Sequence, residues 1–133
     1  MTDARGSGGS EDGSAATEFV LVMLVLLPLF LGIFQLGLFL HVRNTLTACA
    51  HEGARQAANY NGTLGEGRAV AEDCISDSLS PGMAGGTTTG TGSAGGQLLM
   101  VVSVRATMPA IGFWGPRFQF VVSGHAVKEP TPA

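Results

Sequence analysis

Residues 13–40 read GSAATEFVLVMLVLLPLFLGIFQLGLFL, and the run from Phe19 to Leu40 contains no charged side chain. A helix needs about 20 apolar residues to cross the ~30 Å hydrocarbon core of a bilayer, so this run predicts one membrane span over residues 19–40. Glu18 stands at the edge of that run. Because a carboxylate beside lipid is costly unless a positive group neutralises it, Glu18 indicates more than a simple anchor.

The helix is expected to continue beyond the membrane, over residues 14–59. Small and apolar residues recur after Leu40 at a helical period. They are Val42, Leu46, Cys49, Ala50, Gly53, Ala54, Ala57 and Ala58. The side chains of Gly53, Ala54 and Ala57 are small enough for another helix to pack closely against this face.

The rest of the chain divides by composition into five segments. They are a polar, disordered leader (1–13), a short helical segment (60–80), a Gly/Thr-rich flexible loop (81–96), a β-hairpin (97–128) and a tail (129–133). The hairpin is expected because Val102, Val104 and Ala106 alternate with polar residues. The predicted fold class is therefore α+β.

The connection within the predicted hairpin is unusually apolar. It contains Phe113 and Trp114, which are candidate partner contacts. Three interpretations are open: the connection packs on the hairpin, it covers a partner protein, or it enters the bilayer interface, where tryptophan is favoured.

Two cysteines, Cys49 and Cys74, both follow the predicted span. They can form a disulfide if that side of the membrane is oxidising, or they can remain buried thiols. A disulfide here would contribute roughly 3 to 4 kcal/mol by loop entropy. A metal site at these cysteines and His51 is disfavoured, because it has three candidate ligands and no CxxC pair.

Charge and motifs argue against several functions. The net charge is −3 and the seven Lys and Arg residues are scattered, which disfavours nucleic acid. His41, His51 and His125 are separated in sequence, and no nucleophile or paired-carboxylate motif is present. We therefore expect no catalysis, no cofactor and no small-molecule substrate.

The segment from Gly13 to Phe19, the apolar run and residues 51–58 together resemble the TadE-like family, the minor pilins or pseudopilins of the Tad (Flp) type IV pilus system. Gly13 followed by Ser14 is similar to the family's prepilin peptidase site, and Glu18 occupies mature position five. Phe19 stands where Flp pilins usually carry tyrosine. Residues 52–55 read EGAR, which is similar to the family's segment after the membrane helix.

The resemblance implies a type IV pilin-like fold and a bacterial, non-enzymatic subunit. Its implied partners are the membrane, a prepilin peptidase, other Tad pilins or pseudopilins and the inner assembly platform. Cleavage after Gly13, where glycine offers an unhindered extended backbone, would free the amino group of Ser14. In such assemblies the carboxylate at the position of Glu18 is thought to pair with the amino terminus of a neighbouring subunit, and Glu18 and Phe19 would set the register of assembly.

The resemblance places the N-terminus in the cytoplasm and the C-terminal domain outside it. The arginines near the span, Arg5 before it and Arg43 and Arg55 after it, have a slight bias the other way. Two other functions stay open. One is a bitopic membrane adaptor with a small partner-binding domain. The other is a lipoprotein modified at Cys49, disfavoured because the apolar run is longer than a signal peptide allows.

Overall fold

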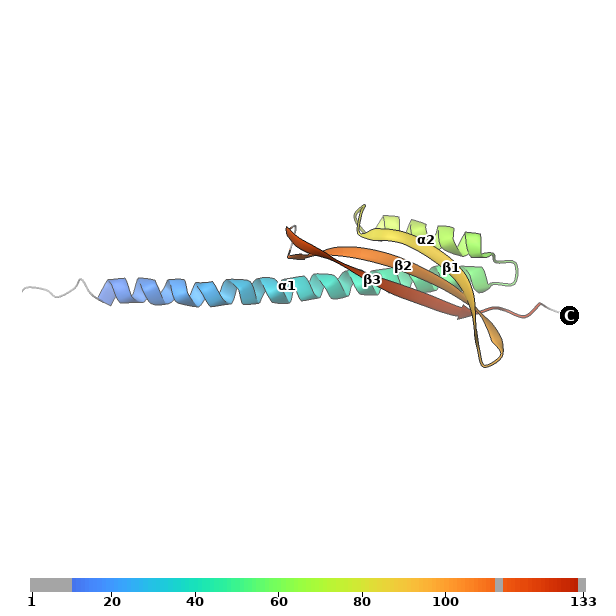
Figure 1. Cartoon of the computed structure of the whole chain (residues 1–133), viewed down its shortest axis with the longest axis horizontal. Coiled ribbons are helices and arrows are strands. Elements are labelled where there is room, and N and C mark those ends of the chain that lie inside the picture. Colours follow the sequence, from blue (N-terminus) through green and yellow to red (C-terminus); the bar gives the residue numbers. More distant parts are fainter. Residues whose placement is uncertain (1–10, 112–113, 132–133) are drawn as a thin grey trace, which may run out of the picture. The chain divides into compact units, whose positions relative to one another are not determined.

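The computed structural model describes residues 11–111 and 114–131 (Figure 1). Its contacts divide the chain into two units, Met1–Gly37 and Leu38–Ala133. The elements described are the helices α1 (Glu11–Ala58) and α2 (Leu64–Ser78) and the strands β1 (Ala84–Ala94), β2 (Gln97–Ile111) and β3 (Trp114–Val127). This order confirms the expected α+β class, with a long N-terminal helix and a second short helix.

The first unit, in its described part, is the apolar portion of α1. Its large apolar side chains, from Phe19 to Leu36, are 38% to 69% exposed. The helix is long and apolar enough to cross a membrane, and an 18-residue window within it has a mean hydropathy of 2.7. Lipid would solvate such side chains, and a helix satisfies its own backbone groups there, so this portion fits a single membrane span.

The boundaries of α1 differ slightly from those predicted. The helix begins at Glu11, three residues before the expected start, and it ends at Ala58, one residue before the expected end. The second helix begins at a capping box, in which Thr63 and Glu66 each bond the other's backbone N–H.

The sheet has three antiparallel strands in the order β1-β2-β3, so the expected two-stranded hairpin gains a strand. The additional strand, β1, occupies most of the segment 81–96 that was expected to be a flexible loop, and that expectation is wrong. The four threonines of β1 favour extended backbone because they are β-branched. Pairing with β2 along ten residue pairs then supplies the hydrogen-bond partners that the isolated segment lacks.

Two glycines connect β1 to β2. Gly95 and Gly96 have φ angles of +58° and +79°, and they separate the paired residues Ala94 and Gln97. Positive φ at both central positions is the geometry of a type I′ turn, whose twist suits a hairpin. The two adjacent glycines therefore set the register of the new strand.

The predicted hairpin corresponds to β2 and β3, whose pairing reaches Ile111 and Trp114. Pro109 lies inside β2, opposite Arg117 and next to a register shift. Proline cannot donate a ladder hydrogen bond, but the pairing of β1 with β2 ends at Ala106. Beyond that point β2 is an edge on one side, and proline is tolerated there.

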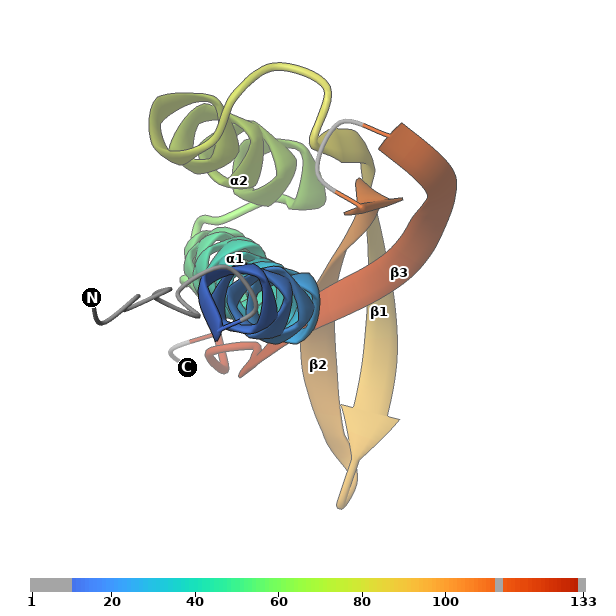
Figure 2. The same cartoon turned by 90° about the vertical axis from the view of Figure 1, so that its left-hand side faces the viewer.

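The core of the second unit lies between the helices and one face of the sheet. Helices α1 and α2 lie on the same side of the strands (Figure 2). The alternation noted in the sequence is confirmed, because Val102, Val104 and Ala106 of β2 are fully buried. From α1, Val42 and Leu46 are buried against this face.

Candidate functional site

The predicted processing segment lies in the first turns of α1. Gly13 is helical, and the hydroxyl of Thr17 donates a 2.8 Å hydrogen bond to its carbonyl oxygen. The expectation of an extended backbone at Gly13 is therefore wrong for the full-length chain. The predicted boundary between leader and helix at residue 13 is also wrong, because α1 already begins at Glu11. Any peptidase that cuts between Gly13 and Ser14 must first unwind this turn.

Glu18 and Phe19 are both exposed on α1. Among the residues that the structure describes, Glu18 has no hydrogen-bond or ion-pair partner. The chain itself thus provides no described group that would neutralise this carboxylate beside the apolar run. Its predicted partner, the amino group of a neighbouring subunit, stays a prediction.

The EGAR segment, residues 52–55, presents two different faces. The side chains of Glu52 and Arg55 are exposed and form an ion pair with an N–O distance of 3.3 Å. Gly53 and Ala54 between them are buried. Because an exposed pair of this kind contributes little, the small residues carry the structural role of the segment.

Gly53 lies where α2 crosses α1 at close range. A Cβ atom on Gly53 would overlap the carbonyl oxygen of Gly67 and lie 2.8 Å from the Cβ of Ala71. Likewise, a Cβ atom on Gly67 of α2 would lie only 2.7 Å from the Cβ of Ala57 on α1. The helix that packs against the small-residue face is therefore α2 of the same chain.

A disulfide between Cys49 and Cys74 joins the same two helices, with a Cα–Cα distance of 5.5 Å. The Cys49 residue is 1% exposed. Both sulfur atoms are bonded to each other, so in this state neither is available for a metal ion or for lipid attachment. The disulfide and the close contact at Gly53 lie one turn apart on α1, and both hold α2 against it.

Strand β3 also approaches α1 at a glycine. A Cβ atom on Gly124 would overlap the backbone of α1 at Ala50 and His51. The next residue, His125, donates its backbone N–H to Nδ1 of His51 over 3.4 Å. Sequence reasoning missed this contact, since Gly124 lies in an otherwise regular strand pattern and only its position opposite the helix makes it necessary.

Lys128 caps the C-terminal end of α1, and sequence reasoning missed it too. Its ammonium group donates hydrogen bonds to the carbonyl oxygens of Ala57, Asn59 and Gly62, at 3.1, 2.7 and 2.8 Å. A cation at this end complements the helix dipole. The following residue, Glu129, donates its backbone N–H to the carbonyl oxygen of Ala58 at 2.9 Å, so the predicted tail begins as an anchored segment.

Lys128→Met is expected to lower the free energy of unfolding by about 2 kcal/mol. The substitution keeps an apolar chain of similar length but leaves three carbonyl oxygens at a helix end without their donor. Urea denaturation of the full-length protein in detergent measures the change. The matched control is Arg68→Met, which removes an exposed ion pair with Glu72 and is expected to cost about 0.5 kcal/mol or less. Equal effects of the two variants would contradict the capping role.

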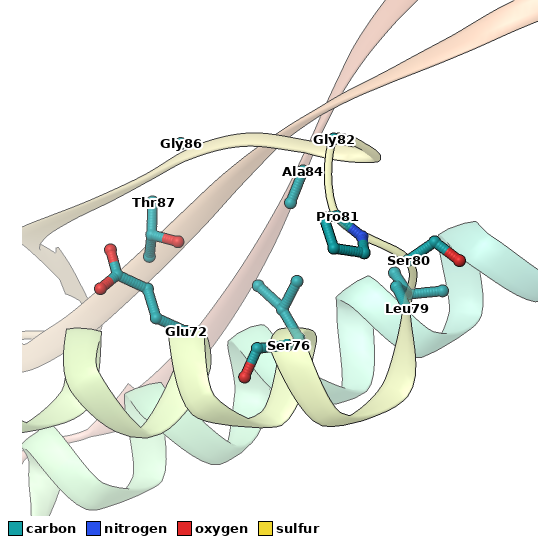
Figure 3. A pocket seen from close by; sticks show the side chains of 10 residues that line it. Glu72, Ser76, Leu79, Ser80, Pro81, Gly82, Ala84, Gly86 and Thr87 are labelled. Carbon is teal, nitrogen blue, oxygen red and sulfur yellow. The ribbon is translucent and has the colours of Figure 1, made fainter.

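A pocket of about 310 Å³ opens between α2 and the start of β1 (Figure 3). Glu72 and Thr87 point toward each other across it, and Leu79 and Pro81 line its other end. The Glu72 carboxylate is bonded to Arg68 at 2.8 Å. In residues 11–111 and 114–131, no three His, Cys, Asp or Glu side chains are grouped to hold a metal ion. The pocket thus combines one paired carboxylate with hydroxyl and apolar groups.

Phe113, one of the two candidate partner contacts, lies outside the described residues. For Trp114 the structure gives the backbone pairing with Ile111 at the end of the β2–β3 hairpin. Partner binding through these two residues stays a prediction.

These features define a class of protein: one apolar helix that can span a membrane, leading into a small α+β unit closed by a disulfide. A family model described as TadE-like protein matches residues 13–55, beginning at the predicted cleavage glycine and ending at the arginine of the EGAR segment. The match confirms the resemblance to the TadE-like family over residues 13–55, and it fits a Tad pilus-associated protein. No curated protein and no solved structure gives a significant match.

Proposed function

We propose that this protein is a non-enzymatic minor pilin or pseudopilin of a Tad (Flp) pilus or a related secretion machine. The observation that carries the proposal is the family match over residues 13–55, combined with an apolar helix segment that the described chain leaves uncovered. The subunit waits in the bacterial cytoplasmic membrane and enters the assembly through this helix. Its partners are a prepilin peptidase, other Tad pilins or pseudopilins and the inner assembly platform.

Processing between Gly13 and Ser14 is the first step of the proposed role. Cutting there creates a positive α-amino group at the start of the mature helix. Glu18, without a described partner in its own chain, can then pair with that group on a neighbouring subunit. The ion pair offsets the desolvation of the carboxylate beside lipid and fixes the helices in register.

The disulfide supports the proposed topology. Structural disulfides persist in oxidising compartments, and Cys49 and Cys74 both lie in the unit that follows the membrane segment. The proposal therefore places this unit outside the cytoplasm and the N-terminus inside it, against the slight bias of the arginines. Protease digestion of spheroplasts tests this, since the C-terminal unit should be accessible.

Mass spectrometry of the protein from a host with an active prepilin peptidase is expected to find Ser14 as the first residue. Gly13→Leu should abolish this cleavage, because a bulky side chain hinders the peptidase at the residue before the cut. No atom lies within 4 Å of a Cβ at Gly13, so the substitution should not disturb the fold. Gly32→Leu, equally unhindered on the same helix, is the matched control and should be processed normally. An intact Met1 in this host would refute the proposal.

Glu18→Gln separates maturation from assembly in the same experiment. The variant should be cut after Gly13 but recovered with pilus components at a much lower yield, because the neutral amide cannot pair with the new amino group. Glu52→Gln, which removes an exposed carboxylate outside the apolar run, should assemble like the wild type.

A further inference from the structure

The direction of β3 along α1 locates one end of the sheet. Near the start of the second unit, the rings of Phe39 and Phe120 are in edge contact, with centroids 5.1 Å apart. At the other end, Glu129 is bonded to Ala58. Strand β3 therefore runs in the same direction as the second part of α1, and its first residues lie at the end of the unit where the helix enters from the apolar run.

Apolar side chains continue past the core at this end. Phe118, Phe120 and Val122 share the core-facing side of β3, because alternate residues of a strand point the same way. Val122 is 6% exposed, Phe120 is partly buried, and Phe118 is 61% exposed. Phe118 lies about 7 Å beyond Phe120 along the strand at 3.3 Å per residue. The row of apolar side chains on this side of β3 therefore extends beyond the buried core.

The helix in the same unit shows the same pattern. Leu38 and Leu40 are 40% and 44% exposed, and with the partly buried Phe39 between them they end the uncharged run. His41 and Arg43 follow and are exposed, as is usual where a helix leaves the hydrocarbon for the headgroups. Arg117, next to Phe118, is also exposed and can reach lipid phosphate while its stem lies along apolar surface.

We propose that this end of the second unit, with Phe118 of β3 and with Leu38 and Leu40 of α1, contacts the bilayer that the helix crosses. The occupant is lipid because Leu38 and Leu40 belong to the same uncharged run as the proposed span, and the ring contact of Phe39 with Phe120 brings β3 to this part of the helix. The inference rests on the membrane-spanning role proposed above. It means that the C-terminal unit sits against the membrane surface before assembly, and must leave that surface when the subunit is extracted.

Fluorescence quenching in vesicles tests the contact. The full-length protein carries one tryptophan, so Trp114→Phe gives a background without that fluorophore. In this background, Phe118→Trp probes the proposed contact, Phe30→Trp probes the span, and Ser93→Trp probes the exposed end of β1 next to the turn. Each variant is reconstituted in phosphatidylcholine/phosphatidylglycerol vesicles with brominated acyl chains, and aqueous iodide is the opposing quencher.

Brominated lipid is expected to quench Phe30→Trp and Phe118→Trp, and to quench Ser93→Trp several-fold less, whereas iodide should show the reverse order. If Phe30→Trp is quenched by lipid but Phe118→Trp behaves like Ser93→Trp, the contact is wrong while the span stands. Protection of Phe118→Trp from both quenchers would show a protein covering this surface and would also overturn the proposal. Failure of lipid to quench Phe30→Trp would overturn the span and the contact together.

Discussion

Gly124→Val is expected to destabilise the C-terminal unit by about 3 kcal/mol or more, which is a large share of the stability of a small domain. The new Cβ would overlap the backbone of α1 at Ala50 and His51. A flexible side chain can move away from such an overlap, but two backbone segments can separate only if β3 leaves the helix. Urea denaturation of the full-length protein in detergent, followed by near-UV circular dichroism, measures the loss.

Gly90→Val is the matched control, because it places the same side chain in a strand of the same sheet. No atom lies within 4 Å of a Cβ at Gly90, and its φ angle is not positive. Valine also favours extended backbone more than glycine does, so this variant should be neutral or slightly stabilising. A Gly124→Val protein as stable as Gly90→Val would show that β3 does not approach α1 at this glycine.

The helical portion of the fold was predictable because its signals are local. The uncharged run from Phe19 to Leu40 is long enough to predict a span by its length alone, and the small residues after it continue the helical period through Ala58. Both patterns can be recognised from a few helical turns of sequence, and neither depends on which other elements pack against the helix. The resemblance to the TadE-like family depends on the same segment, which explains why it ends with the helix.

Strand β1 was missed because its signal is weak in isolation. Glycine lowers strand propensity, and a Gly/Thr-rich segment without large apolar residues resembles a linker. Two local features pointed the other way: the run from Thr87 to Thr89 and the glycine pair Gly95–Gly96. The first favours extended backbone and the second a tight hairpin turn, so a strand followed by a turn was the better prediction.

The contacts of Gly124 and Lys128 could not be found in the sequence, because both depend on where β3 crosses α1. Lys128 follows β3 in the chain, yet its ammonium group is bonded to carbonyl oxygens at residues 57, 59 and 62. Nothing in the residues around Lys128 indicates a helix end. Such contacts are determined by tertiary packing, which neither a periodic sequence pattern nor a short motif specifies.

Because α2 covers part of α1, it limits which residues of α1 can contact a helix of a neighbouring subunit. Gly53, Ala54 and Ala57 are buried within this chain, with Gly53 under α2, so a neighbouring subunit cannot use them unless α2 leaves. The exposed apolar side chains from Phe19 to Leu36 have no such cover among the described residues. If the subunit assembles as proposed, its helix-to-helix contacts are expected in the apolar run, with Glu18 at their edge.

Whether α2 can leave depends chiefly on the disulfide. Replacing both cysteines, Cys49→Ala with Cys74→Ala, is expected to lower the free energy of unfolding by roughly 3 to 4 kcal/mol, since the bridge closes a loop between residues 25 positions apart. The other buried residues of α2 are Gly67, Ala71 and Ile75, of which only Ile75 has a large side chain. We therefore expect the loss to be concentrated in α2, where hydrogen exchange in the double variant should become faster than in β2.

Reductant provides the control for this last prediction, because it removes the bond without changing a residue. The urea midpoint of the wild type should fall on reduction toward that of the double variant, whereas the double variant should not respond. A remaining gap between the reduced wild type and the double variant measures the cavity left at Cys49, which is 1% exposed. A wild-type midpoint that reduction does not move would show that the bridge is absent or does not stabilise the unit. Alkylation in a cell lysate denatured without reductant would then decide between these two cases, since in the unfolded chain Cys49 and Cys74 resist alkylation only while they are in a disulfide.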